Sequence, residues 1–276
     1  MYNDIFSIGP VTIHGYGLMI AIGIVVALIV GDRRAIKRGL NADIIYTMTL
    51  LGVVLGFVAA RILFIITEWE SFVENPAAYI TGAGFVVYGG IIGGILTVIG
   101  YCKIKKVNAL DYLDLMAPSV ALAQGFGRIG CLLAGCCYGR ETTSAFSIVF
   151  THSDFAPNGV HLIPTQIIMS AGDFAIAAIL LIYAMKPRKK GALSSLYVML
   201  YSIGRFFVEF LRNDYRGSVG RLSTSQFIGI IMFVLSFVAF AIVIPRIGNM
   251  KSTECCADSK QDTTNDSPEN DVKAGE

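Results

Sequence analysis

Residues 5–31 read IFSIGPVTIHGYGLMIAIGIVVALIVG and contain no charged side chain. A helix needs about 20 consecutive, mainly apolar residues to cross the hydrocarbon core of a bilayer. Two further uncharged runs, residues 75–102 and 222–245, exceed that length as well. The sequence therefore predicts a protein that crosses a membrane several times.

The composition excludes an ordinary soluble domain. Of the 276 residues, 54% are hydrophobic and 15% are charged, and one core cannot bury that much apolar surface. The first ten residues lack the basic segment of a secretory signal, and the apolar run that follows is longer than a signal's. We therefore expect this run to be the first membrane helix and not a cleaved signal peptide.

The predicted fold class is all-α, a polytopic membrane protein with seven transmembrane helices. Apolar stretches between helix breakers place these helices at residues 14–31, 44–67, 82–101, 112–127, 166–185, 192–211 and 225–246. We expect residues 1–248 to form one membrane domain. Residues 249–276 are polar, with almost nothing to bury, and are predicted to be a disordered cytoplasmic tail.

Basic residues orient the predicted helices. They follow the first, third and fifth helices, at Arg33, Arg34, Lys37 and Arg38, at Lys103, Lys105 and Lys106, and at Lys186, Arg188, Lys189 and Lys190. Cytoplasmic loops are enriched in lysine and arginine. The N-terminus is therefore predicted to lie outside and the C-terminus inside, with the segment 128–164 outside.

A few charged residues lie within the predicted helices. A charge at a helix centre costs about 2.5–3.5 kcal/mol on insertion scales, so such residues usually line a polar cavity. Arg61, Arg128 and Arg205 all fall in the outer half of the membrane in the predicted orientation. A guanidinium group can form bidentate hydrogen bonds with a phosphate. The three arginines therefore favour a binding site for a phospholipid headgroup.

The sixth predicted helix has a polar stripe. Its members repeat at nearly helical spacing and are Tyr197, Tyr201, Arg205, Glu209 and Arg212. One interpretation is an internal salt bridge to Glu209 with both arginines reaching the outer surface. The other is an inward-facing anion site.

Two other groups of residues are less informative about function. Asp111 and Asp114 share one helix face near the cytoplasmic start of the fourth helix and are weak site candidates. Overlapping small-xxx-small pairs in residues 89–94 (GGIIGG) are typical of close helix packing.

The most distinctive segment is GRIGCLLAGCCYGR, residues 127–140. It resembles the signature of the bacterial prolipoprotein diacylglyceryl transferase family, which begins GRIGN and ends in an aromatic residue, a glycine and an arginine. The resemblance covers most of residues 10–245. Further positions similar to family motifs are His14 to Leu18 around Tyr16, Arg61, Gly84, Gly89, Gly90, Asp114, Ala117, Pro118, Pro164, Thr165, Gln166, Tyr201, Gly204, Arg205, Phe206, Glu209 and Arg212.

The resemblance implies an activity. Enzymes of this family move the diacylglyceryl group of phosphatidylglycerol onto the lipobox cysteine of a prolipoprotein, beside its signal peptide, in the bacterial cytoplasmic membrane, and release glycerol 1-phosphate. Negative charge develops on the departing phosphate, and Arg128 and Arg205 are expected to stabilise it. Tyr16, Arg61, Asp114, Gln166, Tyr201, Glu209 and Arg212 are the corresponding candidates for substrate binding.

The chain departs from the family pattern at positions expected to take part in proton transfer. Tyr88 stands where the family has a histidine often proposed as the base, and a phenol with a pKa near 10 is a poor base. Cys131 replaces an asparagine, and Cys136 an acidic residue. Ile168 and Met169 replace a tyrosine and a glutamate. Tyr88 and, as a substitute base, His14 are the remaining catalytic candidates, since His152 and His161 lie farther along the outer segment.

The cysteines of the signature have three interpretations. Cys131, Cys136 and Cys137 are small packing residues, a disulfide, or reactive thiols whose pKa nearby arginines lower. A metal site is not expected, because no second ligand pair with suitable spacing follows. No organic cofactor and no nucleic-acid partner is expected either.

Three functions compete at this point. A transferase fits the retained arginines. A diverged paralogue that binds phospholipid or exported peptide without transfer fits the altered positions, Tyr88 and Cys131 above all. A secondary transporter fits the hydropathy but lacks internal repeats.

Overall fold

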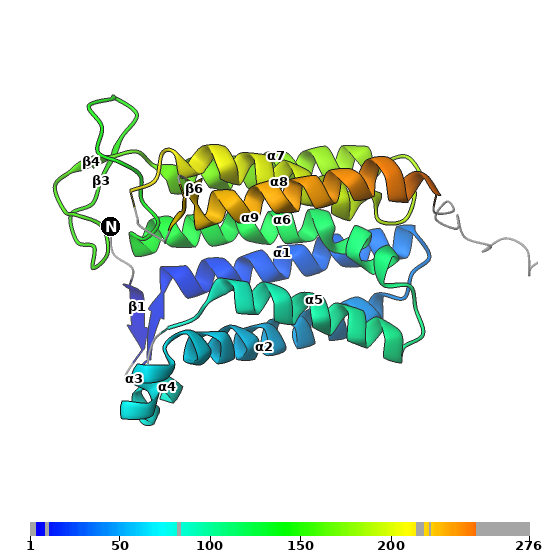
Figure 1. Ribbon diagram of the computed structural model, residues 1–276, viewed down its shortest axis with the longest axis horizontal. Coiled ribbons are helices and arrows are strands. Elements are labelled where there is room, and N and C mark those ends of the chain that lie inside the picture. Colours follow the sequence, from blue (N-terminus) through cyan, green and yellow to red (C-terminus); the bar gives the residue numbers. More distant parts are fainter. Residues whose placement is uncertain (1–3, 9–10, 82–83, 214–217, 221, 247–276) are drawn as a thin grey trace, which may run out of the picture.

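The computed structural model describes residues 4–246 except 9–10, 82–83, 214–217 and 221. Over these residues the chain forms seven long helices (Figure 1). They are α1 (Gly15–Lys37), α2 (Ala42–Thr67), α5 (Val87–Ile104), α6 (Ala109–Ala134), α7 (Thr165–Tyr183), α8 (Ala192–Glu209) and α9 (Thr224–Val238). The tail predicted for residues 249–276 lies outside the described residues.

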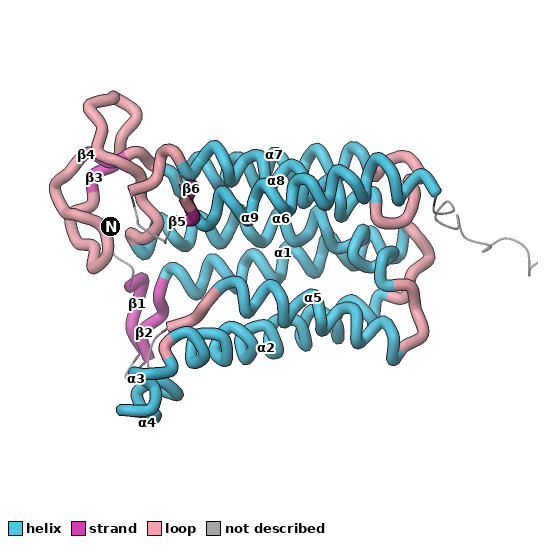
Figure 2. The backbone as a smooth tube through the Cα atoms, viewed as in Figure 1, coloured by secondary structure: helices cyan, strands magenta, loops and turns pink. Residues whose placement is uncertain are grey.

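The long helices lie side by side and give the molecule two ends (Figure 1). At one end, here called the loop end, α1 begins and α2, α6 and α8 finish, and the longest connection, residues 135–164, extends from it (Figure 2). The opposite end, here called the basic end, holds the turns after α1, α5 and α7. The three clusters of lysine and arginine named above fall in or beside these turns, at one end of the bundle.

The chain is mainly helical, as the predicted all-α class requires, but short strands that were not predicted form at the loop end. Three antiparallel strand pairs form there: β1 (Asp4–Ile8) with β2 (Val11–His14), β3 (Ile148–Val149) with β4 (His161–Leu162), and β5 (Ser218–Val219) with β6 (Leu222–Ser223). Two short helices, α3 (Trp69–Glu74) and α4 (Pro76–Thr81), follow α2. Apolar runs beside turns form hairpins where the chain leaves the bundle, which hydropathy alone does not distinguish from helix.

Several helix boundaries also differ from the prediction. α6 continues seven residues past the expected end at 127, through the glycines of the signature, and stops at Gly135, which has a left-handed φ of 72°. Packing of α1 and α7 against α6 outweighs the low helix propensity of glycine. α5 begins at Val87, later than the predicted residue 82. α9 ends in a π-helical turn, Ala239–Val243, and a 3₁₀ turn, Ile244–Arg246.

Small residues let the helices approach closely. α1 packs along α6, and α2 along α5. A Cβ atom added to Gly89 would lie 2.5 Å from the carbonyl oxygen of Ala59 on α2, which confirms the close packing predicted for the glycine run. Gly23 of α1 meets α6 in the same way, 3.1 Å from the carbonyl oxygen of Ala123.

The chain is a polytopic, mainly helical membrane protein. Five segments of the described residues are long and apolar enough to cross a bilayer, namely α1, α2, α5, α7 and residues 224–242. The helices α6 and α8 are not among them. These are the two long helices that contain Arg128 and the polar stripe.

Candidate functional site

Arg128 lies in the last two turns of α6, at the loop end. The glycine beside it, Gly130, permits close contact with α1, since a Cβ atom there would lie 3.2 Å from the carbonyl oxygen of Tyr16. Gly130 of the signature therefore acts in helix packing, whereas Gly135 ends the helix in a left-handed conformation. The contact at Gly130 brings Tyr16 near Arg128, with which it interacts electrostatically.

The Arg128 guanidinium faces α7 and α8 as well. It interacts electrostatically with Tyr201 and with Asp173 on α7. Asp173 is only 4% exposed, and its Oδ2 has no hydrogen-bond partner among the described residues. Asp173 was not among the predicted site residues. The signal was present, because it is the only charged residue of α7 and an ionisable residue inside a membrane helix usually marks a functional site.

The polar stripe of α8 faces inward. Arg205 and Glu209 form an ion pair of 2.7 Å whose side chains are 12% and 9% exposed. Arg205 Nη2 also donates a hydrogen bond to Ser225 Oγ on α9, at 3.1 Å. Tyr201 stacks on Tyr197, with ring centroids 6.0 Å apart. The predicted internal salt bridge is present, yet the arginine does not reach outward, which favours the inward-facing interpretation.

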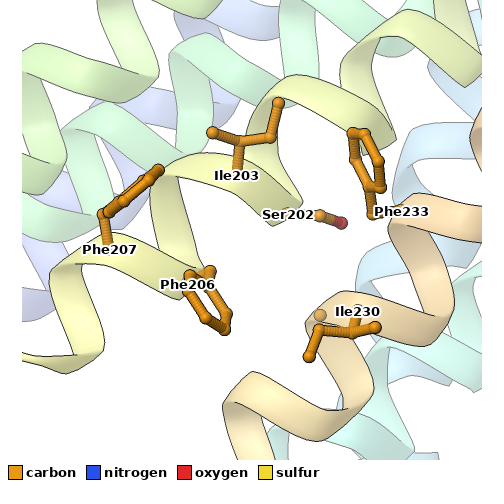
Figure 3. A pocket seen from close by; sticks show the side chains of 7 residues that line it. Ser202, Ile203, Phe206, Phe207, Ile230 and Phe233 are labelled. Carbon is orange, nitrogen blue, oxygen red and sulfur yellow. The ribbon is translucent and has the colours of Figure 1, made fainter.

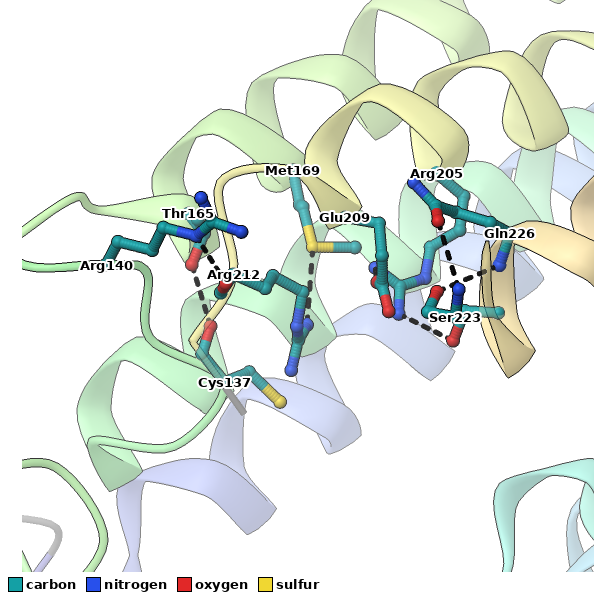
Figure 4. Close-up of polar contacts among 10 residues, drawn as sticks. Cys137, Arg140, Thr165, Met169, Arg205, Glu209, Arg212, Ser223 and Gln226 are labelled. Carbon is teal, nitrogen blue, oxygen red and sulfur yellow. Dashed lines mark hydrogen bonds and ion pairs between the residues drawn. The ribbon is translucent and has the colours of Figure 1, made fainter. Parts of the chain in front are cut away.

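Arg212 lies just beyond α8 and is 5% exposed. Its Nη1 contacts the Sδ atom of Met169 on α7 at 4.0 Å, and its backbone oxygen accepts a hydrogen bond from Arg140 Nε at 3.2 Å (Figure 4). Gly139 pairs with Arg212 as an isolated β-bridge. The end of the signature and the end of the stripe are thus joined, and Arg212 is held inside the protein.

The three signature cysteines converge at the end of α6. Cys131 is buried, Cys136 and Cys137 are half-buried, and none of the three is in a disulfide. Their sulfur atoms lie within 4.8 Å of one another. Hydrogen bonds with the Cys131 and Cys136 thiols and with Arg212 lower the pKa of the Cys137 thiol. Of the three interpretations, the disulfide is absent from this structure, and the thiols adjoin the arginines.

Gln166 and Thr165, at the start of α7, hold the backbone of these cysteines. Gln166 Nε2 donates to the carbonyl oxygen of Cys136 at 2.8 Å, and Thr165 Oγ1 donates to that of Cys137 at 2.8 Å (Figure 4). Both side chains are almost fully buried. The predicted substrate-binding residue Gln166 thus positions the thiols, and its Oε1 has no partner among the described atoms.

Asp114 lies apart from this group. It is 14 residues before Arg128 on α6, about 21 Å along the helix axis. Its carboxylate accepts hydrogen bonds from the backbone nitrogens of Gly191 and Ser194, each at 2.8 Å. Asp114 therefore caps α8 at the basic end, a structural role that the D-x-x-A-P resemblance did not indicate.

The other predicted residues lie on different elements of the loop end. Arg61 donates a hydrogen bond to the Gly84 carbonyl oxygen at 2.6 Å and lies over the Phe85 ring. Tyr88 is 41% exposed in the first turn of α5, which packs on α2. His14 is exposed and precedes α1 as its N-cap residue. No described hydrogen bond or ion pair joins Arg61 or Tyr88 to Arg128.

An apolar groove opens beside the arginines. It lies between α8 and α9 and is lined by Ser202, Ile203, Phe206, Phe207, Gly229, Ile230 and Phe233 (Figure 3). Its volume is about 180 Å³. Phe206 follows Arg205 directly in the sequence, so the groove and the ion pair share one stretch of α8.

Several known proteins are similar to this chain. The sequence profile described as prolipoprotein diacylglyceryl transferase matches residues 3–255. A Clostridium tetani protein named phosphatidylglycerol–prolipoprotein diacylglyceryl transferase is 48% identical over 239 residues, which cover 86% of this chain and 96% of that protein. A Clostridium perfringens protein named phosphatidylglycerol–prolipoprotein diacylglyceryl transferase 2 is 52% identical over 225 residues, covering 80% and 88%.

A more distant Staphylococcus aureus protein with the former name is 34% identical over 238 residues, which cover 84% of this chain and 85% of that protein. These matches span the helices that hold Arg128, Asp173 and Arg205. The chain belongs to the prolipoprotein diacylglyceryl transferase family.

Proposed function

We propose that this chain transfers the diacylglyceryl group of phosphatidylglycerol to the cysteine thiol of a prolipoprotein and releases glycerol 1-phosphate. The observation that supports this most is the inward-facing set Arg128, Arg205 and Arg212, drawn from α6 and α8 to the same end of the bundle. Asp173 and Glu209 are the carboxylates that face Arg128 and Arg205. Three guanidinium groups exceed two carboxylates, so one phosphate balances the charge.

The transfer reaction requires the positive charge that these arginines supply. The acceptor sulfur attacks a glycerol carbon, the carbon–oxygen bond to the phosphate breaks, and negative charge grows on the departing phosphate oxygen. Fixed guanidinium donors in a water-poor site stabilise such charge without reorganising. Arg128 and Arg205 are the proposed catalytic residues, and Arg212, Tyr201, Tyr16 and Gln166 complete the proposed binding site, with Glu209 orienting Arg205.

The lipid tail needs an apolar path beside the headgroup. The groove between α8 and α9 is lined mainly by phenylalanine and isoleucine, and its residue Phe206 follows Arg205 in the sequence. An acyl chain of phosphatidylglycerol placed there keeps its contact with apolar side chains while the phosphate meets the arginines. The acceptor cysteine, beside its signal peptide, then approaches from the loop end.

The proposed function requires all seven long helices to span the membrane. α6 and α8 have polar residues because these residues face the proposed site, not the lipid. The basic end then faces the cytoplasm by the enrichment of lysine and arginine in cytoplasmic loops. The loop end faces outward from the bacterial cytoplasmic membrane, where exported prolipoproteins emerge.

Replacement of a host's own enzyme tests the proposal. The chain is expressed in a bacterium while the resident transferase is depleted, and mass spectrometry follows the N-terminal cysteine of a reporter lipoprotein. We expect a diacylglyceryl adduct on that cysteine. If the chain reaches the membrane in normal amount and no adduct forms, the transferase function is wrong, and binding without transfer is the better description.

A further inference from the structure

The three cysteine thiols at the end of α6 match the ligand set of a soft metal ion. Zn²⁺ binds thiolate sulfur at about 2.3 Å, which requires sulfur atoms about 3.8–4.0 Å from one another. The sulfur atoms of Cys131, Cys136 and Cys137 lie within 4.8 Å of one another. Small side-chain rotations therefore suffice to place all three around one ion. A disulfide would use only two of them.

The backbone around the thiols is held in place for this convergence. Cys137 has a φ of 62°, a left-handed conformation that non-glycine residues rarely adopt and that marks functional sites when the surroundings enforce it. The carbonyl oxygens of Cys136 and Cys137 are held by Gln166 and Thr165, and Cys136 N donates to the carbonyl oxygen of Cys131 at 3.1 Å. Contacts from both α6 and α7 thus hold the three cysteines in position.

The surrounding charge suits a thiolate complex. Three thiolates and one divalent ion have a net charge of about −1. Arg128 interacts electrostatically with Cys131 and Cys137, and Arg212 forms a hydrogen bond with Cys137. These guanidinium groups stabilise the negatively charged thiolates electrostatically.

We propose that Cys131, Cys136 and Cys137 bind a thiophilic divalent ion such as Zn²⁺, whose fourth position takes the acceptor cysteine of the prolipoprotein. This proposal rests on the proposed transferase function. Catalytic zinc sites have three protein ligands and one open position, and a coordinated thiol is deprotonated. The cluster thereby supplies the thiolate in a chain that has Tyr88 in place of a histidine base.

The proposed step is balanced. The acceptor thiol replaces a water on the ion and loses its proton to solvent. Its sulfur then forms a bond to the glycerol carbon, and the carbon–oxygen bond to the phosphate breaks. Glycerol 1-phosphate leaves with the bonding electron pair, and the proton released earlier accounts for the negative charge it gains. The thioether product binds the ion more weakly than a thiolate and is released.

Metal content tests the site without any activity measurement. The reference protein is the full chain purified in detergent with Cys255→Ser and Cys256→Ser, which removes the two tail cysteines. We expect about one Zn²⁺ per chain by elemental analysis after loading with Zn²⁺ and gel filtration, and a thiolate-to-metal absorption band on loading with Co²⁺. Cys131→Ser, Cys136→Ser and Cys137→Ser are each expected to lose both signals.

Cys102→Ser is the matched control, because Cys102 is a buried thiol on α5 outside the cluster. It is expected to keep the metal. The Co²⁺ absorption band of the reference chain itself shows thiolate coordination. The test therefore does not depend on the folding of the serine variants. An absent band, a metal content unaffected by all three serine variants, or a disulfide among the three cysteines in the purified chain would overturn the site.

Activation of the acceptor thiol has its own test. Transfer by the reference chain is measured before chelation, after chelation and after readdition of Zn²⁺. We expect loss of at least 100-fold on chelation, about 2.7 kcal/mol, and recovery on readdition. Unchanged transfer by metal-free protein would refute the activation step. Stoichiometric metal on the three cysteines without any transfer would instead count against the transferase function and leave the metal site standing.

Discussion

Arg128 on α6 and Asp173 on α7 interact electrostatically, and Asp173 Oδ2 has no hydrogen-bond partner among the described residues. A buried carboxylate with an open oxygen is costly unless a charge compensates it. Arg128 provides that charge. The two residues are therefore expected to act together, with Asp173 setting the orientation of the guanidinium that meets the phosphate.

Removal of the Arg128 guanidinium is predicted to abolish most transfer. Arg128→Ala should reduce kcat by about 10²–10³-fold, the usual effect of losing one donor to developing negative charge. The measurement is mass spectrometry of a lipobox peptide incubated with phosphatidylglycerol vesicles. Lys103→Ala, an exposed cation at the basic end, serves as the control. Equal rates in both variants would remove Arg128 from the proposed mechanism.

Neutralising Asp173 tests the coupling between the two residues. Asp173→Asn should lower kcat by about tenfold, near 1.4 kcal/mol, with a smaller change in KM for the lipid, because the guanidinium loses its orientation. In the double variant with Arg128→Gln the second substitution should add little, since coupled residues are not additive. Additive effects would show that the two side chains act independently.

The ion pair of Arg205 and Glu209 is predicted to stabilise the fold as well as the site. Glu209→Gln leaves a nearly buried guanidinium without its partner, which costs about 3–5 kcal/mol for buried pairs. We expect a clearly lower midpoint of thermal unfolding in detergent. Size-exclusion chromatography of heated samples measures this midpoint. An unchanged midpoint would mean that solvent or lipid compensates Arg205.

Close packing of α2 on α5 predicts a contrast between two glycines of one helix. Gly89→Ala places a methyl group 2.5 Å from the carbonyl oxygen of Ala59, whereas no atom lies within 4 Å of a methyl group at Gly94. Overpacking costs about 1–3 kcal/mol, so Gly89→Ala should lower the thermal midpoint and Gly94→Ala should not. Equal midpoints would show that α5 shifts freely along α2.

Apolar length predicted five of the long helices, because it is a property of each segment by itself, whereas α6 and α8 were predicted from less apolar stretches between helix breakers. The end of α6 was predicted too early, since glycine is a weak helix former and only contacts with α1 and α7 keep residues 128–134 helical. Hairpins such as β1 with β2 were missed because their apolar residues resemble the start of a membrane helix.

The site was predictable only in part. Arg128, Arg205 and Arg212 stood out as charges in apolar helices, and the structure brings them to one end. The thiol cluster was not predictable from spacing, because Cys131 belongs to a helix and Cys136 and Cys137 follow a left-handed glycine. Asp114 was assigned to substrate binding by resemblance, yet its hydrogen bonds to Gly191 and Ser194 are visible only in three dimensions.

Those hydrogen bonds bear on how the protein is assembled during synthesis. The first turn of α8 has no cap from its own N-cap residue, Gly191. Its free amide groups are satisfied by the carboxylate of Asp114, which belongs to a helix made much earlier. α8 is also one of the two long helices that fall short of an autonomous span. The amide end of α8 is therefore expected to find its partner only after α6 has been made and has folded beside it.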